Sequence, residues 1–417
     1  MEPNVNHFSL ALMLSSALDL VDPEVYDHHF TVAYIALSLA EEAGYSSEAR
    51  NTVFLAALYH DIGAVGLVDK KGLLVFDALN AETHSVLGYN FLRKYPIFRS
   101  ISLLIRYHHK AWDFGKGALD GHIAVPDAAH LLHIADRIAV LINRNRPLID
   151  QIAYISESIR VNTPSLFSPD LYTIWERLSG KKMFWSPLAS RSVQSLLQRS
   201  VIAQSADVTA PHMEEIMRLY AQLIDYRSPY TFAHSSSTAA VSVFIAQKLG
   251  FSSDDINDLK IAAYLHDIGS LGIPAELINK KGTITVTELN IIRSHSFNSY
   301  ILLKQLPGFE RIALWAGHHH ESLNGKGYPF GKKANEISFP AQLLRVTEMF
   351  CAMREERAYR VAYSVGETLR ILRETAQSGE INSKIVDVFI RESSRCDQIV
   401  MSEQVLCKKD YDEWRTL

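Results

Sequence analysis

The chain has 417 residues, 47% hydrophobic and 21% charged, which is ordinary for a globular protein and enough for two domains of roughly 150–200 residues. Its net charge of −4 excludes an overall basic field for long nucleic acid or an anionic membrane, and no uncharged apolar run approaches the roughly 18–20 residues that span a bilayer. Three cysteines lack metal-ligand spacing, and no basic region precedes the first apolar stretch. We therefore expect a cytoplasmic protein with reduced thiols.

Helical periodicity dominates the chain. Between residues 34 and 60, apolar residues recur at three- and four-residue spacing around one glycine turn, and Ser46 follows that turn as a candidate N-cap. The same pattern returns between 244 and 266, where Ser252 stands in the equivalent place. Strand-like alternation is scarce, and only GTITVTEL at 282–289 suggests a short extended piece. The sequence thus predicts an all-α fold.

The tetrapeptide His-Asp-Ile-Gly occurs at 60–63 and again at 266–269, each time after an apolar run. Around it the same residue types recur in one order: a histidine, the His-Asp pair, a histidine, a double histidine and an acid. The first series is His28, His60, Asp61, His84, His108, His109 and Asp136. The second series is His234, His266, Asp267, His295, His319, His320 and Glu348. A chance match of four residues would not extend so far, so we predict a tandem repeat of one helical domain.

The recurring residue types predict a metal centre in each half. Burying five imidazoles and two carboxylates from separate helices is costly unless a cation organises them. Imidazole and carboxylate ligands without thiolate favour iron, manganese or another divalent first-row ion over a structural zinc site. An acid directly after a ligating histidine, Asp61 or Asp267, can bridge two ions. Two ions about 3.5–4 Å apart can activate water and stabilise charge on phosphate, which predicts hydrolysis of phosphoesters.

These residues resemble the HD superfamily of metal-dependent phosphohydrolases. The second copy, over about 212–395, is more specifically similar to the HD-GYP branch, because HHESLNGKGYP at 319–329 and RAYR at 357–360 match its signatures. The first copy has HHKAWDFGKGALDG from residue 108 and is similar to the wider superfamily only. Tandem arrangements of this kind occur among bacterial cyclic-dinucleotide phosphodiesterases, which implies a signalling nucleotide as substrate.

The resemblance also implies roles for individual residues. Both series would be metal ligands for two or three divalent ions per domain, with Asp61 and Asp267 as the bridging, catalytic carboxylates. Glu24, one turn before His28, matches a glutamate that accompanies a third ion in some relatives. The substrate-binding residues would be Ser270, Lys326, Gly327, Tyr328, Arg357 and Arg360.

The second copy also departs from the family pattern. Ser270 occupies a position where the family usually has a lysine near the scissile phosphate, and Glu348 stands where aspartate is usual. Cys351 replaces a further aspartate. The metal ligands and the recognition loop are therefore kept, while one usual catalytic helper is missing.

We expect an HD domain without Gly-Tyr-Pro at 5–180, a connecting segment at 181–211, an HD-GYP domain at 212–395 and a tail at 396–417. The second half is predicted to open cyclic di-GMP or 3′,3′-cyclic GMP-AMP to a linear dinucleotide. The first half would be a second phosphohydrolase, a candidate 5′-nucleotidase for the linear product. The alternatives are a non-hydrolysing receptor and a plain nucleotidase. The base identity, the choice between iron and manganese, and a homodimer or signalling partner stay open.

Overall fold

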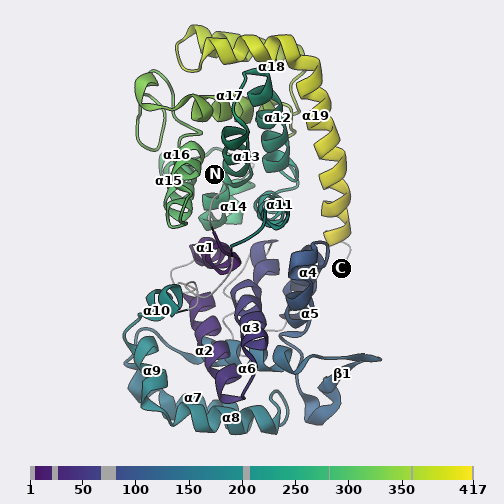
Figure 1. The fold of residues 1–417 in the computed structure, drawn as a ribbon, viewed down its shortest axis with the longest axis vertical. Coiled ribbons are helices and arrows are strands. Elements are labelled where there is room, and N and C mark those ends of the chain that lie inside the picture. The colour runs from purple at the N-terminus through teal and green to yellow at the C-terminus, as the bar shows by residue number, and fades with distance from the viewer. Residues whose placement is uncertain are drawn as a thin grey trace. The chain divides into compact units, whose positions relative to one another are not determined.

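The computed structural model describes residues 5–20, 27–66, 81–200, 207–280, 282–357 and 360–415 (Figure 1). Helices make up nearly all of its regular structure, which confirms the all-α prediction. The strands among these residues, β1 (Leu119–Asp120) and β2 (Ile123–Ala124), form one short antiparallel hairpin. None of the described helices combines the length and the apolar character that a membrane crossing needs.

No strand forms at 282–289, where the sequence predicts a short extended piece: the backbone of Thr285 is extended, but a helix begins at Val286. Thr285 caps α15 (Val286–Lys304) in a capping box: its side chain accepts from the Glu288 N–H, and the Glu288 carboxylate accepts from the Thr285 N–H. This reciprocal pair satisfies two backbone donors that a helix start otherwise leaves unpaired, so the threonines begin a helix. The N-caps predicted at Ser46 and Ser252 are confirmed, since their side chains accept from Ala49 N and Asp255 N.

The chain forms two compact units, Asn6–Asp207 and Val208–Thr416, with Val5 belonging to the second. The helices of the first unit are α1 (His7–Asp19), α2 (His28–Glu42), α3 (Ser47–Tyr59), η1 (Ile62–Gly66), α4 (Ala81–Arg93), η3 (Pro96–Phe98), α5 (Arg99–Tyr107), η4 (Asp113–Ala118), α6 (Asp127–Leu141), η5 (Leu148–Asp150), α7 (Ile152–Val161), α8 (Pro169–Ser179), α9 (Lys182–Ala189) and α10 (Val193–Ser200). In its core α2 packs against α3 and α6, and α4 packs against η1 and α5.

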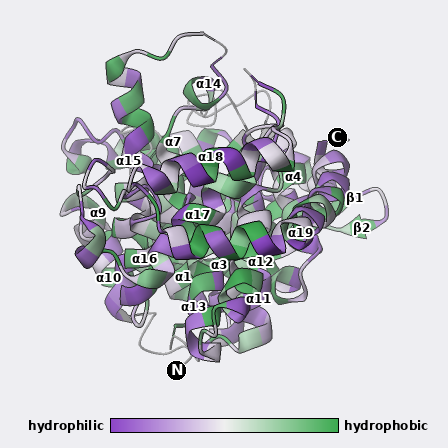
Figure 2. Cartoon of the chain, turned by 90° about the horizontal axis from the view of Figure 1, so that it is seen from above, coloured by the Kyte–Doolittle hydropathy of each residue, from purple (hydrophilic) through white to green (hydrophobic). Residues whose placement is uncertain are grey.

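The second unit repeats this packing. Its helices are α11 (Ala210–Tyr226), α12 (His234–Lys248), α13 (Ser253–Leu265), η7 (Ile268–Gly272), α14 (Ala275–Ile278), α15, α16 (Glu310–Gly317), η8 (Ala334–Glu336), α17 (Phe339–Met353), α18 (Val365–Gln377) and α19 (Ser383–Arg415). Buried small residues from Ser235 to Ala239 let α12 lie in close contact with α13, α17 and α19. Green and purple residues alternate along surface helices such as α18, as amphipathic helices require (Figure 2).

The unit boundaries differ from the expected domains at two places. Within the expected connecting segment at 181–211, α9 and α10 belong to the first unit, while α11 begins the second. The expected tail at 396–417 continues α19 as far as Arg415. The reason is a heptad-like burial pattern, because the spacing of Phe389, Cys396 and Val400 continues beyond residue 396.

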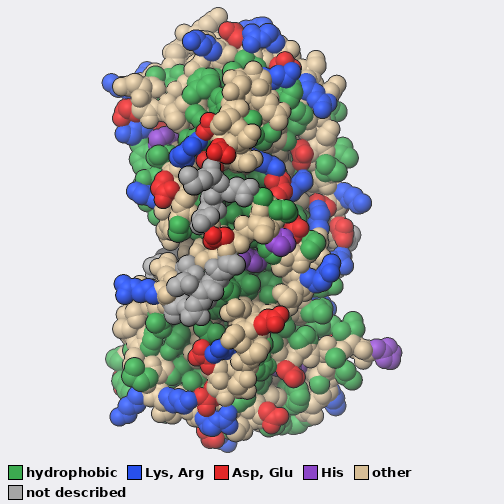
Figure 3. Space-filling model, in the orientation of Figure 1, with side chains coloured by type: hydrophobic (Ala, Val, Ile, Leu, Met, Phe, Trp, Pro, Cys, Tyr) green, Lys and Arg blue, Asp and Glu red, His purple; other side chains and the backbone are tan. Residues whose placement is uncertain are grey.

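On the face seen in Figure 3, acidic and basic side chains are interspersed over both units.

Candidate metal centres

In the first unit the predicted ligands lie where helices begin, end or cross. His28 is the first residue of α2, His60 and His108 are the C-caps of α3 and α5, and His84 lies within α4. The structure brings the series together in two groups whose ligand atoms lie within 4.8 Å of one another. The groups are His28, His60 and Asp136, and Asp61, His84, His108 and His109.

Asp61 faces both groups at once. Its Oδ2 atom lies 3.3 Å from His60 Nε2 and 4.0 Å from His28 Nε2. Its Oδ1 atom lies 3.0 Å from His84 Nε2 and 3.8 Å from His108 Nε2. One carboxylate with an oxygen toward each group has the geometry of a bridging ligand between two ions.

The hydrogen bonds of the imidazole rings define which nitrogen faces inward. His60 Nδ1 donates to Ala57 O at 2.8 Å, and His108 Nδ1 donates to Ile105 O at 2.7 Å. A carbonyl oxygen can only accept, so Nδ1 carries a hydrogen, and Nε2 is the nitrogen that can bind a metal ion. His28 Nε2 lies 3.3 Å from His60 Nε2, a close approach of ring nitrogens that a cation between them would stabilise. The donor set therefore fits a divalent metal ion.

Charge in the first centre also suits metal binding. Burial alone would raise the pKa of Asp61, but the nearby histidines, His60 first, hold it well below its usual value. Burial lowers the pKa of His108 to about 4. At neutral pH the carboxylate is therefore ionised and this imidazole is neutral, which are the forms that bind metal. His60 differs, because burial would lower its pKa but Asp61 raises it to about 9, so a metal ion would displace its proton on binding.

The second unit repeats the arrangement. Its two groups are His234, His266 and Asp267, and His295, His319 and His320. Asp267 Oδ2 lies 3.5 Å from His266 Nε2, while Asp267 Oδ1 lies 3.2 Å from His295 Nε2 and 3.5 Å from His319 Nε2. The Nε2 atom of His266 is buried and has no hydrogen-bond partner among the described residues. A buried ring nitrogen without a hydrogen-bond partner fits the role of a metal ligand.

The late acids of the two units are placed differently. Asp136 Oδ1 lies 3.2 Å from His28 Nε2, within a ligand group. Glu348 lies in neither compact group of the second unit; its Oε2 is 3.4 Å from Arg345 Nη1, and its side chain lines the adjacent cavity. Its role as a metal ligand stays a prediction. Glu24 falls outside the residues that the structure describes.

Glu355 is a functional candidate that the sequence did not indicate. It is 4% exposed, and both of its carboxylate oxygens lie 3.1 Å from His234 Nδ1. Burial would lower the pKa of His234, but the charge and hydrogen bond of Glu355 raise it to about 9. By accepting from Nδ1–H, Glu355 fixes the ring of His234 and leaves Nε2 for a metal ion, as carboxylates that hydrogen-bond to metal-bound histidines do. The pair is 121 residues apart, so no local pattern could reveal it.

We expect Glu355→Gln to weaken metal binding in the second unit by about 10–100-fold, which is the usual effect of losing a carboxylate that hydrogen-bonds to a metal-binding histidine. Titration of the apoprotein with manganese, followed by calorimetry, measures this. The metal affinity of the first unit is the internal control and should not change. Unaltered affinity in both units would show that Glu355 has no orienting role.

The glycine of each His-Asp-Ile-Gly motif has a packing reason. A Cβ atom on Gly63 would lie 2.0 Å from His84 O, and one on Gly269 would lie 2.2 Å from His295 O. Only a residue without a side chain lets η1 and η7 approach the helices that carry these histidines. The motif thus contains two predicted ligands and makes the close contact that brings a third predicted ligand near them.

A cavity of about 230 Å³ opens beside the second centre, lined by Asp267, Ser270, His295 and Arg357 among others. Arg227 also lines it and donates to the backbone oxygens of Ser270 and Ile273. Burial lowers the pKa of Arg227 to about 10, so its guanidinium stays charged at neutral pH. The sequence did not single out this cation on the wall nearest Ser270.

The Gly-Tyr-Pro loop lies against the second centre. The ring centroid of Tyr328 is 4.7 Å from that of His320. A Cβ atom on Gly327 would lie 2.2 Å from Ser322 N, so the turn requires glycine. The buried carboxylate of Glu321 accepts from Phe330 N at 2.6 Å and holds the loop. Lys326 is exposed on the same loop.

The two predicted phosphate-binding arginines have different surroundings. Arg357 lines the cavity, and its Nη2 donates to Glu355 Oε2 at 2.9 Å. Arg360 is not among the described residues that line it; its guanidinium donates to Ala352 O at 2.7 Å and to Glu355 O at 3.2 Å. Arg360 therefore caps the end of α17 in this structure, and Arg357 is the arginine available to a substrate.

Comparison with known proteins agrees with this geometry. Models of the HD domain match residues 25–141 and 218–385. The 3′3′-cGAMP-specific phosphodiesterase 1 of Vibrio cholerae is 28% identical over 417 residues, covering 96% of this chain and 95% of that protein. The cyclic di-GMP phosphodiesterase response regulator RpfG of Xanthomonas campestris is 31% identical over 206 residues, covering 49% and 54% of the two chains.

A crystal structure of a cyclic GMP-AMP-specific phosphodiesterase of V. cholerae (V-cGAP3) has the same fold. Its TM-score is 0.63 at 20% identity, with 95% of this chain and 97% of that chain covered. Both halves of the duplicated sequence thus match one domain type, and the relatives are phosphodiesterases. The chain consists of two HD domains in tandem and belongs to the HD-domain phosphohydrolases, with homology to the HD-GYP cyclic-dinucleotide phosphodiesterases.

Proposed function

We propose that the second unit hydrolyses a cyclic dinucleotide, cyclic di-GMP or 3′,3′-cyclic GMP-AMP, to the linear dinucleotide. The observation that carries this proposal is the position of Asp267, which faces two histidine groups and also lines the 230 Å³ cavity that contains Arg357. The similarity of nearly the whole chain to a 3′3′-cGAMP-specific phosphodiesterase supports this substrate class.

In this reaction, different residues of the second unit would bind the metal ions, the phosphate and the rest of the substrate. The two histidine groups and Asp267 would hold two divalent ions, iron or manganese, which supply an activated water and Lewis-acid stabilisation when bound. Arg357 can pair with a phosphate through its planar guanidinium. Burial raises the pKa of Tyr328, so its hydroxyl stays protonated and can donate a hydrogen bond to the substrate.

We propose that the first unit is a second phosphohydrolase, acting on the 5′-phosphate of the linear product. Its two ligand groups include Asp136, so the full predicted series except Glu24 is assembled there. Where the second unit has the Gly-Tyr-Pro loop, the first has η4 and the β1–β2 hairpin. A site for a phosphate monoester needs metal ions and an open pocket but no surface that binds two bases. The first unit, which lacks the Gly-Tyr-Pro loop, fits that requirement.

Product identification tests the proposal. The full-length protein, loaded with iron or manganese, is incubated with each cyclic dinucleotide, and linear dinucleotide and inorganic phosphate are followed over time. We expect the linear dinucleotide to appear first and phosphate later. Tight binding of the cyclic dinucleotide without product over hours would favour a receptor. Hydrolysis of mononucleotides alone would indicate a plain nucleotidase.

Substitutions at Ser270 distinguish the phosphodiesterase hypothesis from the receptor hypothesis for the second unit. Its neutral hydroxyl replaces the family's usual lysine, and general acid help is worth typically about 10²–10⁴-fold. We expect a slow but real phosphodiesterase, because the metal ions carry most of the charge stabilisation and Arg227 and Arg357 keep two positive charges at the cavity. Ser270→Lys should raise turnover or leave it unchanged, and Ser270→Ala should cost little. A large loss with Ser270→Ala would show that the hydroxyl itself is required.

A further inference from the structure

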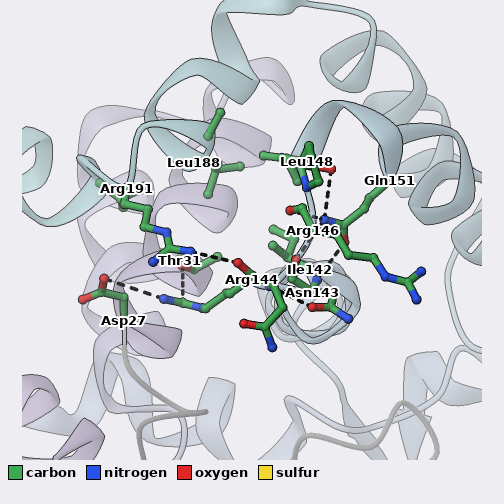
Figure 4. Close-up of a pocket in the computed structure, with 14 residues that line it drawn as sticks. Asp27, Thr31, Ile142, Asn143, Arg144, Arg146, Leu148, Gln151, Leu188 and Arg191 are labelled. Carbon is green, nitrogen blue, oxygen red and sulfur yellow. Dashed lines mark hydrogen bonds and ion pairs between the residues drawn. The ribbon is translucent and has the colours of Figure 1, made fainter.

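A second cavity, of about 340 Å³, lies in the first unit and is rich in arginine (Figure 4). Its walls come from the start of α2, the segment after α6, and the connection between α9 and α10. Three arginines line it, Arg144, Arg146 and Arg191, together with Asp27, the only acid among its lining residues. Basic side chains therefore outnumber acidic ones among the lining residues.

Two of these arginines meet at one side of the cavity. Arg144 Nη1 lies 3.7 Å from Asp27 Oδ2, and Arg144 Nη2 donates to Thr31 Oγ1 at 3.3 Å. Arg191 Nη2 donates to the backbone oxygen of Arg144 at 2.8 Å. Figure 4 shows both guanidinium groups beside Asp27. Two guanidinium groups thus converge at one side of the cavity, where both can donate hydrogen bonds to one anion.

The backbone supports this placement of Arg191. Its φ angle is 53°, a left-handed conformation that residues other than glycine rarely adopt. The Ser192 N–H donates to Pro187 O at 3.0 Å, and the Arg191 side chain donates to Arg144. A residue keeps such a conformation only when surrounding contacts hold it there, and residues of this kind are concentrated at binding and active sites.

The cavity is built partly from α2 and from the segment after α6, and these two helices also carry predicted ligands of the first metal centre. Asp27 directly precedes the ligand His28, and Thr31 lies one turn further along α2. Arg144 follows the end of α6, the helix that carries the ligand Asp136. In the second unit Arg357 follows α17 in the same way and lines the cavity of the metal centre. The duplicated domain thus places an arginine after the last ligand helix in both copies.

We propose that this cavity is a nucleotide-phosphate site, in which Arg144 and Arg191 bind a phosphate of the linear dinucleotide while apolar walls contact its nucleoside. The walls are formed by Ile142, Leu148 and Leu188. Guanidinium groups form paired, charge-assisted hydrogen bonds with phosphate oxygens, which suits two arginines that converge. This inference rests on the proposed phosphohydrolase activity of the first unit and names the residues that would hold its substrate.

The test compares Arg144→Gln, Arg191→Gln and the double variant in the full-length, metal-loaded protein. Phosphate release from a linear GpA dinucleotide bearing a 5′-phosphate gives KM and kcat. We expect each single variant to raise KM about tenfold or more, with a smaller change in kcat. Arg144→Lys should restore part of the affinity. The matched control is Arg160→Gln, an exposed arginine of α7 paired with Glu157.

Ring opening and the metal content of the first unit should stay unchanged in all variants, which separates substrate binding from damage to the fold. Arg191 is exposed, so its loss should not prevent folding. Unchanged KM in both single variants would overturn the proposal. If the wild type releases no phosphate, the proposed activity fails, and equilibrium binding of the same dinucleotide in an Asp267→Ala background then tests the cavity alone. Equal affinity with and without the arginines would overturn it there.

Discussion

Asp267→Ala should abolish ring opening of the cyclic dinucleotide and leave phosphate release from the linear product intact. Asp267 faces both histidine groups of the second unit, so its loss would remove the carboxylate that we expect to bridge two ions. Metal ions contribute several kcal/mol of stabilisation to such reactions. At 1.36 kcal/mol per tenfold, kcat/KM should fall by on the order of 10³-fold or more.

Asp61→Ala is the matched control, because Asp61 has the same position between the groups of the first unit. It should remove metal from the first unit and abolish phosphate release while ring opening continues. Metal analysis with product identification measures both effects. If Asp61→Ala stopped ring opening and Asp267→Ala did not, the two roles would be reversed. A wild-type protein supplied with iron and manganese that holds fewer than two ions per chain would contradict a metal centre in each unit.

Gly269→Ala should destabilise the second unit and remove its metal. The added Cβ would lie 2.2 Å from His295 O and 2.5 Å from Ser299 N, both backbone atoms that cannot turn aside. Overpacking of this kind costs about 1–3 kcal/mol or more. For a domain of this size, Tm should fall by about 2–4 °C for each kcal/mol. The displaced α15 would also carry His295 away from Asp267, so metal affinity should fall with stability.

Gly366→Ala serves as the control in the same unit. It lies in α18, and a Cβ there would meet nothing within 4 Å. Alanine favours helix over glycine, so Tm should stay the same or rise slightly. Calorimetry of the metal-loaded and metal-free proteins measures both variants. An unchanged Tm and metal content for Gly269→Ala would show that η7 can move away from α15 at no cost.

The sequence by itself determined the helical class, the duplication and the ligand series. Helical periodicity and the caps at Ser46 and Ser252 depend on residues a few positions apart, so they can be read locally. The ligand series could be read because it occurs twice in one order, and the structure brings all of the described members together except Glu348. The capping box that begins α15 was also local, yet its threonines resemble a strand, and that prediction was wrong.

Only the tertiary structure showed which side chains hydrogen-bond to the predicted ligands and which line the cavities. Glu355 reaches His234 across 121 residues, and Arg227 reaches the Ser270 backbone across 43. Arg191 meets Arg144 from a segment that the sequence indicated only as a connection. These contacts depend on how helices distant in the chain pack together, and residue type and spacing along one helix do not encode that packing. The predicted ligands could therefore be identified from the sequence, whereas the side chains that contact them and line the cavities became visible only in the fold.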